Sequence, residues 1–365
     1  MRGAALRPNL NSDRVRQPFE SNERALIFNK IHPRYIALDL GTTSTLIHLE
    51  GQGVVVNEPS VIAVNEKGQI EALGHEAKRM LGRTPPNIRA IRPMEDGVIA
   101  DYETAELMLK ALLRQALKGA SIVKPRALCC VPSGITEVEK RAIRDSVKNA
   151  GVREIYLIEE PIAAAVGMRL PIEESTGSIV VDVGGGTTEV AVMCLGGVVV
   201  SESRKIGGNV MDEAVDRYLR SHYNIFVGEQ ICEEIKITIG SAVPLEEEEN
   251  FVVKGRNMLN GIPTTVTISS TEVREALREC IVQVIGAVRS TLEQTPPELA
   301  SDIVNAGINM TGGGSLLKRL DDAITQETNL RVHRAASPLT TIIEGLGMIL
   351  DDFRRYRRLF NLYPT

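Results

Sequence analysis

The sequence has no tryptophan, few aromatic residues and only five cysteines. Aromatic residues make up 4% of the chain, which argues against a stacking platform for carbohydrate or single-stranded nucleic acid. The cysteines form no Cys-x-x-Cys pair and their number is odd, so they indicate neither a disulfide framework nor a zinc site. We expect them to be small buried apolar residues in the reducing cytoplasm.

Long apolar runs and an excess of positive charge are also absent. No stretch approaches the length of a transmembrane helix, and the first residues lack the apolar core of a signal peptide. The formal net charge is −5, so the chain as a whole is not expected to bind nucleic acid. With 365 residues, 43% of them hydrophobic, the chain is long enough for two domains or one two-lobed unit.

The most informative stretch is residues 179–188, where an apolar run meets a glycine turn. The run ends in an acid, three glycines and two hydroxyl residues: Asp182, Gly184, Gly185, Gly186, Thr187 and Thr188. Glycines let backbone amides approach an anion closely, and the hydroxyls add donors. The acid would repel phosphate unless a divalent cation such as hydrated Mg²⁺ lay between them. The pattern predicts a metal–nucleotide phosphate loop, with an ordinary capped glycine turn as the alternative.

A second copy of this motif begins at Tyr35. Its apolar run ends in Asp39, and Thr42, Thr43 and Ser44 follow Gly41. In both copies a strand, a glycine turn and another strand come next. Because an internal duplication is harder to obtain by chance than one glycine loop, we expect two related halves with a nucleotide between them.

The segment from Thr136 to Glu139 fits two interpretations. At the start of an expected helix, Thr-x-x-Glu is a capping box in which Glu139 accepts a hydrogen bond from the amide of Thr136. Alternatively, Glu139 orients the water that attacks the γ-phosphate of a nucleotide. We expect that one rotamer cannot serve both roles, and the local sequence favours the cap.

Two further stretches could bind a nucleoside. Glu233 and Lys236 share one face of an expected helix and could hold a ribose or base edge, although an exposed ion pair between them is the simpler interpretation. The last apolar strand is followed by a third glycine turn, made of Gly312, Gly313, Gly314 and Ser315. Close backbone approach at a helix start suits adenine, ribose or phosphate, and a plain strand-to-helix turn is an equal alternative.

Three segments combine apolar or aromatic residues with basic ones. The leader, residues 1–34, contains Leu26, Ile27 and Phe28 among more basic than acidic residues, and Ile122 and Val123 lie between two lysines. The tail, residues 351–365, is basic and aromatic. Each composition suits an anionic membrane surface. The alternatives are a loose leader, the start of a strand and a solvated terminal helix.

Together these motifs resemble the actin-like ATPase superfamily and, within it, the MreB/Mbl family of rod shape-determining bacterial actins. The resemblance extends from residue 35 to about residue 350. The segments that match the family are residues 39–43, 57–61, 82–85, 92–94, 96–101, 138–142, 158–161, 182–190 and 311–317. Three positions depart from the family pattern, because Thr43-Ser44 replaces Ala-Asn and Asn209 replaces an Asp.

The resemblance implies an α/β, two-lobed actin-like fold. Such a fold consists of duplicated ribonuclease-H-like domains, each with a smaller subdomain, and holds the nucleotide in the cleft between the lobes. We expect a flexible leader (1–34), lobe I (35–165) with an insertion at about 60–100, lobe II (166–350) with an insertion at about 208–275, and the tail (351–365). The last helices return toward lobe I.

The resemblance also implies site residues and the cofactors ATP or ADP with Mg²⁺. Asp39 and Asp182 would hold the hydrated metal, and Glu139 and Asp182 would be catalytic. Phosphate contacts are implied for Thr42, Thr43, Ser44, Gly184, Gly185, Gly186 and Thr187, and nucleoside contacts for Glu233, Lys236 and residues 312–315.

The function implied by the resemblance is a filament that organises cell-wall synthesis. The chain would be a slow Mg²⁺-dependent ATPase that forms paired protofilaments with itself and binds no nucleic acid. It would lie on the anionic inner face of the plasma membrane, through Ile122-Val123 or the leader, and would work with the elongation or division machinery. The alternatives are a non-polymerising actin-fold ATPase and a small-molecule kinase.

Overall fold

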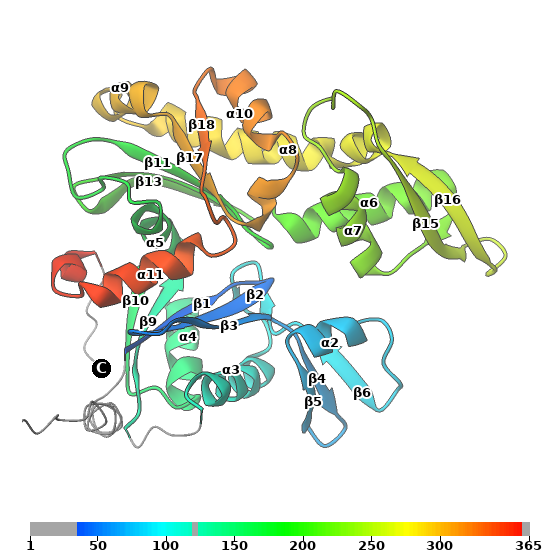
Figure 1. The fold of residues 1–365 in the computed structure, drawn as a ribbon, viewed down its shortest axis with the longest axis horizontal. Coiled ribbons are helices and arrows are strands. Elements are labelled where there is room, and N and C mark those ends of the chain that lie inside the picture. The colour runs from blue at the N-terminus through cyan, green and yellow to red at the C-terminus, as the bar shows by residue number, and fades with distance from the viewer. Residues whose placement is uncertain (1–34, 119–122, 360–365) are drawn as a thin grey trace, which may run out of the picture.

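The computed structural model describes residues 35–118 and 123–359, and two five-stranded sheets dominate it (Figure 1). The first sheet has the order β10-β9-β1-β2-β3 and the second has the order β13-β12-β11-β17-β18. The first is made of β1 (Tyr35–Leu40), β2 (Ser44–Leu49), β3 (Gly53–Pro59), β9 (Arg126–Val131) and β10 (Glu154–Glu159). The second is made of β11 (Ser178–Val183), β12 (Thr188–Cys194), β13 (Gly197–Arg204), β17 (Ile308–Thr311) and β18 (Val332–Arg334).

The two sheets are copies of one pattern. In each, three consecutive strands form an antiparallel meander, and two later strands pair in parallel beyond the first strand. Even a bulge is repeated, between Ile47 and His48 in β2 and between Val192 and Met193 in β12. The bulges coincide when Thr42-Thr43 is aligned with Thr187-Thr188, so the halves share local twist as well as strand order. This confirms the predicted duplicated α/β fold.

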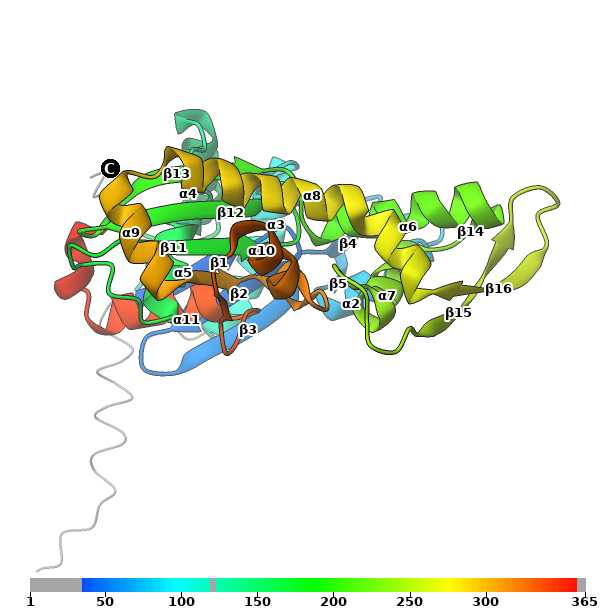
Figure 2. The same ribbon diagram turned by 90° about the horizontal axis from the view of Figure 1, so that it is seen from above.

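Helices pack on both faces of each sheet (Figures 1 and 2). Alternate residues of β1 serve different layers, because Ile36 and Leu38 pack toward α3 (Tyr102–Ala116) and α4 (Glu137–Asn149) while Ala37 faces the opposite way. On that other face, α5 (Glu160–Gly167) and α11 (Thr341–Asp351) fill the space between the two sheets. The outer face of the second sheet carries α8 (Ser270–Gln294), α9 (Pro297–Ala306) and α10 (Leu320–Thr328).

Each large sheet is extended by a smaller unit, and the two smaller units lie at the same end of the molecule (Figure 1). The first contains β4 (Ile62–Asn65), β5 (Ile70–Leu73), α2 (His75–Met80) and β6 (Ile88–Ile91). The second contains α6 (Gly208–Tyr223), β14 (Ile225–Phe226), α7 (Glu229–Ile239), β15 (Asn250–Asn257) and β16 (Pro263–Ser269). The short elements are β7 (Met94–Glu95), β8 (Val98–Ile99), η1 (Gly313–Leu316) and η2 (Arg355–Arg358). We call the first sheet with its unit lobe I and the second with its unit lobe II.

The helices α5 and α11 touch through their backbones where they cross between the sheets. A Cβ atom at Gly345 would overlap the carbonyl oxygen of Ala163, and one at Gly167 would overlap the carbonyl oxygen of Thr341. The alanines of α5 are also fully buried here. Small residues therefore set the distance between the lobes at this crossing.

In the described residues, no helix has the length and apolar character needed to span a membrane.

We predict that Gly345→Ala lowers the free energy of unfolding by about 1–3 kcal/mol, because the added methyl group forces the crossing helices apart. Urea denaturation measures this loss. Gly197→Ala is the matched control, since a Cβ there would meet only the carbonyl oxygen of Cys194, at 4.0 Å. Equal stability of the two variants would show that the crossing is not tightly constrained.

Candidate functional site

The two predicted phosphate turns face each other across the gap between the lobes. A Cβ atom at Gly186 would lie 2.6 Å from the hydroxyl oxygen of Thr42, and one at Gly185 would overlap the side chain of Thr43. The Thr42 hydroxyl itself accepts a hydrogen bond from the amide of Gly97, 2.8 Å away. The duplication thus brings one turn of each copy to a single place, as the sequence predicted.

Neighbouring segments satisfy the carbonyl groups of both turns. In the second turn, Gly208 donates its amide to the carbonyl of Gly184 (3.0 Å) and Asn209 donates to Gly185 (2.8 Å). In the first turn, Ser60 donates its amide to the carbonyl of Thr43 (2.9 Å) and its hydroxyl to that of Gly41 (2.7 Å).

The amides of these turns are in the opposite situation. Within residues 35–118 and 123–359, those of Thr42, Thr43, Gly185 and Gly186 have no hydrogen-bond acceptor. Backbone amides without acceptors that converge from two sides form a concave site for an anion. Phosphate groups match this arrangement.

Two buried carboxylates lie behind the turns, at the ends of β1 and β11. Burial, and to a lesser degree the charge of Asp39, raises the pKa of Asp182 to about 7. Burial raises the pKa of Asp39 to about 6, although a hydrogen bond from the Cys130 thiol opposes this shift. The Oδ1 atom of Asp182 is buried and has no hydrogen-bond partner in the described structure.

The structure adds two acids that the sequence analysis did not select. Burial raises the pKa of Glu189 to about 8, against the hydrogen bonds that it accepts from the Ser133 amide at 3.2 Å. Burial, together with the charges of Glu189 and the two aspartates, raises the pKa of Glu160 well above its usual value. Their sequence signals were present, because Glu160 belongs to a Glu-Glu-Pro motif and Glu189 directly follows the threonines of the second turn.

No basic side chain in the described structure neutralises these four acids. Among the described residues none of Asp39, Glu160, Asp182 and Glu189 forms a salt bridge. Nor does the described part of the chain group three His, Cys, Asp or Glu side chains closely enough to ligate an ion directly. A divalent cation that keeps its water shell fits both observations, because its waters can bridge to carboxylates that are too far apart to share it.

Glu139 forms the capping box at the start of α4. Its Oε2 atom accepts hydrogen bonds from the amide (2.7 Å) and the hydroxyl (2.6 Å) of Thr136. These bonds hold the pKa of Glu139 below its usual value, so the group is ionised at neutral pH. Its Oε1 atom has no hydrogen bond to any described residue. The cap therefore uses only one carboxylate oxygen. Whether one rotamer can serve both cap and catalyst stays a prediction.

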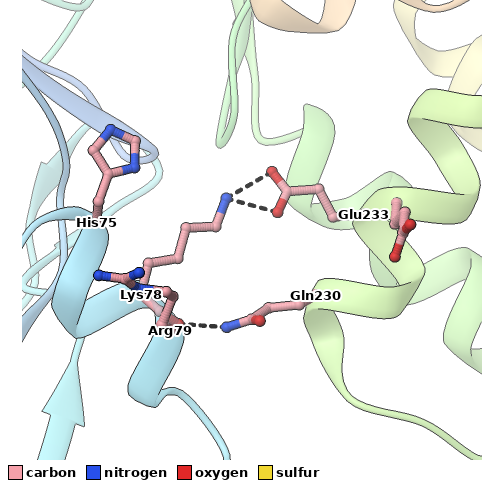
Figure 3. Close-up of a pocket in the computed structure, with 6 residues that line it drawn as sticks. His75, Lys78, Arg79, Gln230 and Glu233 are labelled. Atoms are coloured by element: carbon pink, nitrogen blue, oxygen red, sulfur yellow. Dashed lines mark hydrogen bonds and ion pairs between the residues drawn. The ribbon is translucent and has the colours of Figure 1, made fainter.

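Glu233 and Lys236 of α7, which the sequence analysis expects to bind the nucleoside, each contact another residue. Lys236 lies 2.8 Å from Asp212 and donates to the carbonyl of Gly208 at 2.9 Å. Glu233 instead pairs with Lys78 of lobe I (Figure 3). The simpler interpretation, an exposed ion pair between Glu233 and Lys236, does not describe this arrangement. Lys236 thus contacts α6 within lobe II, whereas Glu233 reaches across to lobe I.

The third glycine turn packs directly on the second phosphate turn. Gly312 has a φ of 82°, and a Cβ there would overlap the carboxylate of Asp182. Ser315 donates its hydroxyl to the carbonyl of Gly312 at 2.6 Å. The turn of residues 312–315 therefore lies against the end of β11 that carries Asp182. Glycine is required at Gly312 both by its left-handed backbone and by the close approach.

A cavity of about 860 Å³ extends from this site between the two smaller units. Thr42 lies at one part of its wall, and Arg92, Asp212 and Glu229 line it farther out. Such a volume accommodates a nucleotide-sized ligand.

Of the membrane candidates, Val123 is half-buried just before β9, whereas Leu26, Ile27, Phe28 and Ile122 lie outside the described residues.

We predict that Asp182→Asn stabilises the metal-free chain at pH 8. The pKa of Asp182 rises from 3.8 to about 7 on folding, so the folded chain binds the proton more tightly and the free energy of unfolding falls as pH rises from about 4 to above 7. Neutral Asn removes this dependence. Urea denaturation in EDTA should give a gain of about 1–3 kcal/mol at pH 8 and little gain at pH 4. A loss of stability at pH 8 would contradict the electrostatic assignment.

The chain has close relatives over most of its length. A family model described as MreB/Mbl protein matches residues 33–358. The cell shape-determining protein MreB of Escherichia coli K12 is 50% identical over 322 residues, which cover 87% of this chain and 93% of that protein. The cell shape-determining protein Mbl of Bacillus subtilis 168 is 43% identical over 320 residues, which cover 87% and 96%.

Solved structures agree with this relationship. The MreB5 of Spiroplasma citri, determined bound to ADP, superposes with a TM-score of 0.85 at 37% identity and covers 89% of this chain and 98% of its own. A double helical filament of MamK, at 19% identity and a TM-score of 0.74, shares the fold. The chain therefore has an actin-like fold and belongs to the MreB/Mbl family.

Proposed function

We propose that this chain is an ATP-dependent, filament-forming bacterial actin that organises cell-wall synthesis and thereby determines cell shape. The single observation that carries the proposal is the pair of opposed turns. Among the described residues, their amides have no acceptor and the buried carboxylates behind them have no basic partner. Relatives named for cell-shape determination support the role in cell shape. The ADP-bound and AMPPNP-bound MreB5 of Spiroplasma citri support an adenine nucleotide as the ligand.

The nucleotide would lie between the lobes. Phosphates would accept hydrogen bonds from Thr42, Thr43 and Ser44 on one side and from residues 184–187 on the other. Glu233, Lys236 and residues 312–315 would hold the nucleoside. Asp39 and Asp182 would hold hydrated Mg²⁺, which supplies positive charge beside the phosphates and lowers the pKa values of the surrounding acids.

Glu139 would orient the attacking water. Its ionised carboxylate keeps Oε1 available for a water hydrogen while Oε2 caps α4. A water aligned with the bond between the β,γ-bridging oxygen and the γ-phosphorus is what phosphoryl transfer requires of such a residue. Because a single positioned carboxylate accelerates the reaction only moderately, we expect slow ATP hydrolysis. This hydrolysis would be coupled to the polymer rather than to metabolism.

The polymer would be a homopolymer of paired protofilaments on the inner face of the plasma membrane. The apolar loop at Ile122 and Val123 and the leader at Leu26, Ile27 and Phe28 would supply the membrane contacts. Cell-wall elongation or division proteins would be its partners. A small-molecule kinase of the same fold would instead transfer phosphate to an added substrate. Release of free phosphate from ATP without such a substrate distinguishes the ATPase from the kinase.

We predict that Glu139→Gln slows phosphate release at least tenfold without loss of stability. Glutamine can still accept the hydrogen bonds of the capping box but orients water less strongly than a carboxylate. Thr136→Ala is the matched control, because it removes the cap, costs about 1 kcal/mol of stability and leaves Oε1 of Glu139 in place. Phosphate release, measured with ATP and Mg²⁺, should fall only in the first variant. A fall confined to the second would return Glu139 to a purely structural role.

We predict that the chain sediments as filaments with ATP and Mg²⁺, and that anionic vesicles sediment with it. Changing Ile122 and Val123 to Ser while deleting residues 1–34 should abolish vesicle binding, because it removes both apolar contacts. Filaments in solution should persist in that variant. Negative-stain images without filaments of the parent chain would refute the polymer, and full vesicle binding by the variant would refute both anchors.

A further inference from the structure

Two ion pairs and one hydrogen bond join the smaller unit of lobe I to that of lobe II. Lys78 of α2 lies 2.6 Å from one carboxylate oxygen of Glu233 and 2.9 Å from the other. Arg92, which follows β6, makes a bidentate contact with Glu229, at 2.6 and 2.8 Å. Gln230 donates its side-chain amide to the backbone carbonyl of Lys78 (Figure 3). We call these five residues the latch.

The latch is divided by charge between the lobes. Both cations come from lobe I, and both acids come from one helix of lobe II, where Glu229 and Glu233 are four residues apart and share a face. Between the two pairs, Gln230 adds an uncharged contact to the backbone of α2. No part of the latch is internal to one lobe, so it contributes stability only while the lobes are close.

The latch lies at the mouth of the proposed nucleotide site. A cavity of about 470 Å³ on one side is lined by Lys78, Gln230 and Glu233. The larger cavity of about 860 Å³, which reaches the phosphate turn at Thr42, is lined by Arg92, Glu229 and again Gln230. Because Gln230 lines both cavities, the latch lies where they adjoin.

The pairs are partly exposed, which makes them reversible. The side chains of Lys78 and Glu233 are each 27% exposed, and those of Arg92 and Glu229 are 28% and 47% exposed. At such exposure water and salt weaken a pair, while bidentate geometry strengthens it. Each pair therefore contributes modestly and can break and re-form.

We propose that the latch holds the lobes closed over a bound nucleotide and that its opening sets the rate of nucleotide release. This rests on the proposed function. Lys78 is in addition a positioning residue, because it fixes the carboxylate of Glu233 that would contact the nucleoside. A ribose hydroxyl that donates to Glu233 would share this carboxylate with Lys78, so nucleotide binding and lobe closure meet at one side chain.

The test uses Arg92 and Glu229, which line the outer part of the larger cavity and are not assigned a contact with the nucleotide. Release of a fluorescent ATP analogue is followed after mixing its Mg²⁺ complex with excess unlabelled ATP. Arg92→Glu and Glu229→Arg should each accelerate release about three- to tenfold, and the double exchange should restore the parent rate. Raising the salt concentration should also accelerate release from the parent.

Arg334→Glu is the matched control. It breaks a pair with Asp321 of similar length (3.0 Å) and exposure (31% and 37%) that lies within lobe II. Release from this variant should equal that of the parent. The latch is refuted if both single variants bind the analogue and release it at the parent rate, or if salt leaves the parent rate unchanged. A parent chain that binds no analogue at all refutes the proposed nucleotide site and the latch with it.

Discussion

The arrangement of the whole site depends on one electrostatic constraint, the burial of like charges contributed by both halves of a duplicated fold. Asp39 and Asp182 end equivalent strands, and Glu160 and Glu189 lie beside them, without a basic side chain among the described residues to neutralise any of the four. Carboxylates in such surroundings are either protonated or matched by a cation. The opposed turns supply the complementary anion site. A cation together with a phosphate chain therefore satisfies both, which neither ligand does alone.

The lobes that carry these groups are joined in two physically different ways. At the crossing of α5 and α11, glycine backbones touch the neighbouring helix, and close packing of this kind is not easily deformed. At the other end, the latch consists of partly exposed ion pairs, whose charged groups can be hydrated by water when the pairs break. A fixed crossing at one end and a reversible contact at the other describe a hinge, with the candidate site between them.

The sequence predicted the parts of this structure whose signal is local or repeated. The duplicated strand–turn–strand pattern gave both phosphate turns, and Thr-x-x-Glu gave the capping box of Glu139, which the structure contains. Contacts between distant segments escaped it. Spacing paired Glu233 with Lys236, whereas the observed partner, Lys78, is 155 residues away. Glu160 and Glu189 carry local signals, a Glu-Glu-Pro motif and a place directly after the second turn. Their perturbed pKa values, however, arise only when β10, β11 and β12 come together.

The most direct test of the account is a crystal structure of the chain with a non-hydrolysable ATP analogue and Mn²⁺, whose anomalous scattering locates the metal. The account predicts a metal peak between Asp39 and Asp182, bridged to them by water, with the phosphates between the two turns and Oε1 of Glu139 facing the γ-phosphate. A metal bound away from these aspartates, or a nucleotide outside the gap between the lobes, would contradict it.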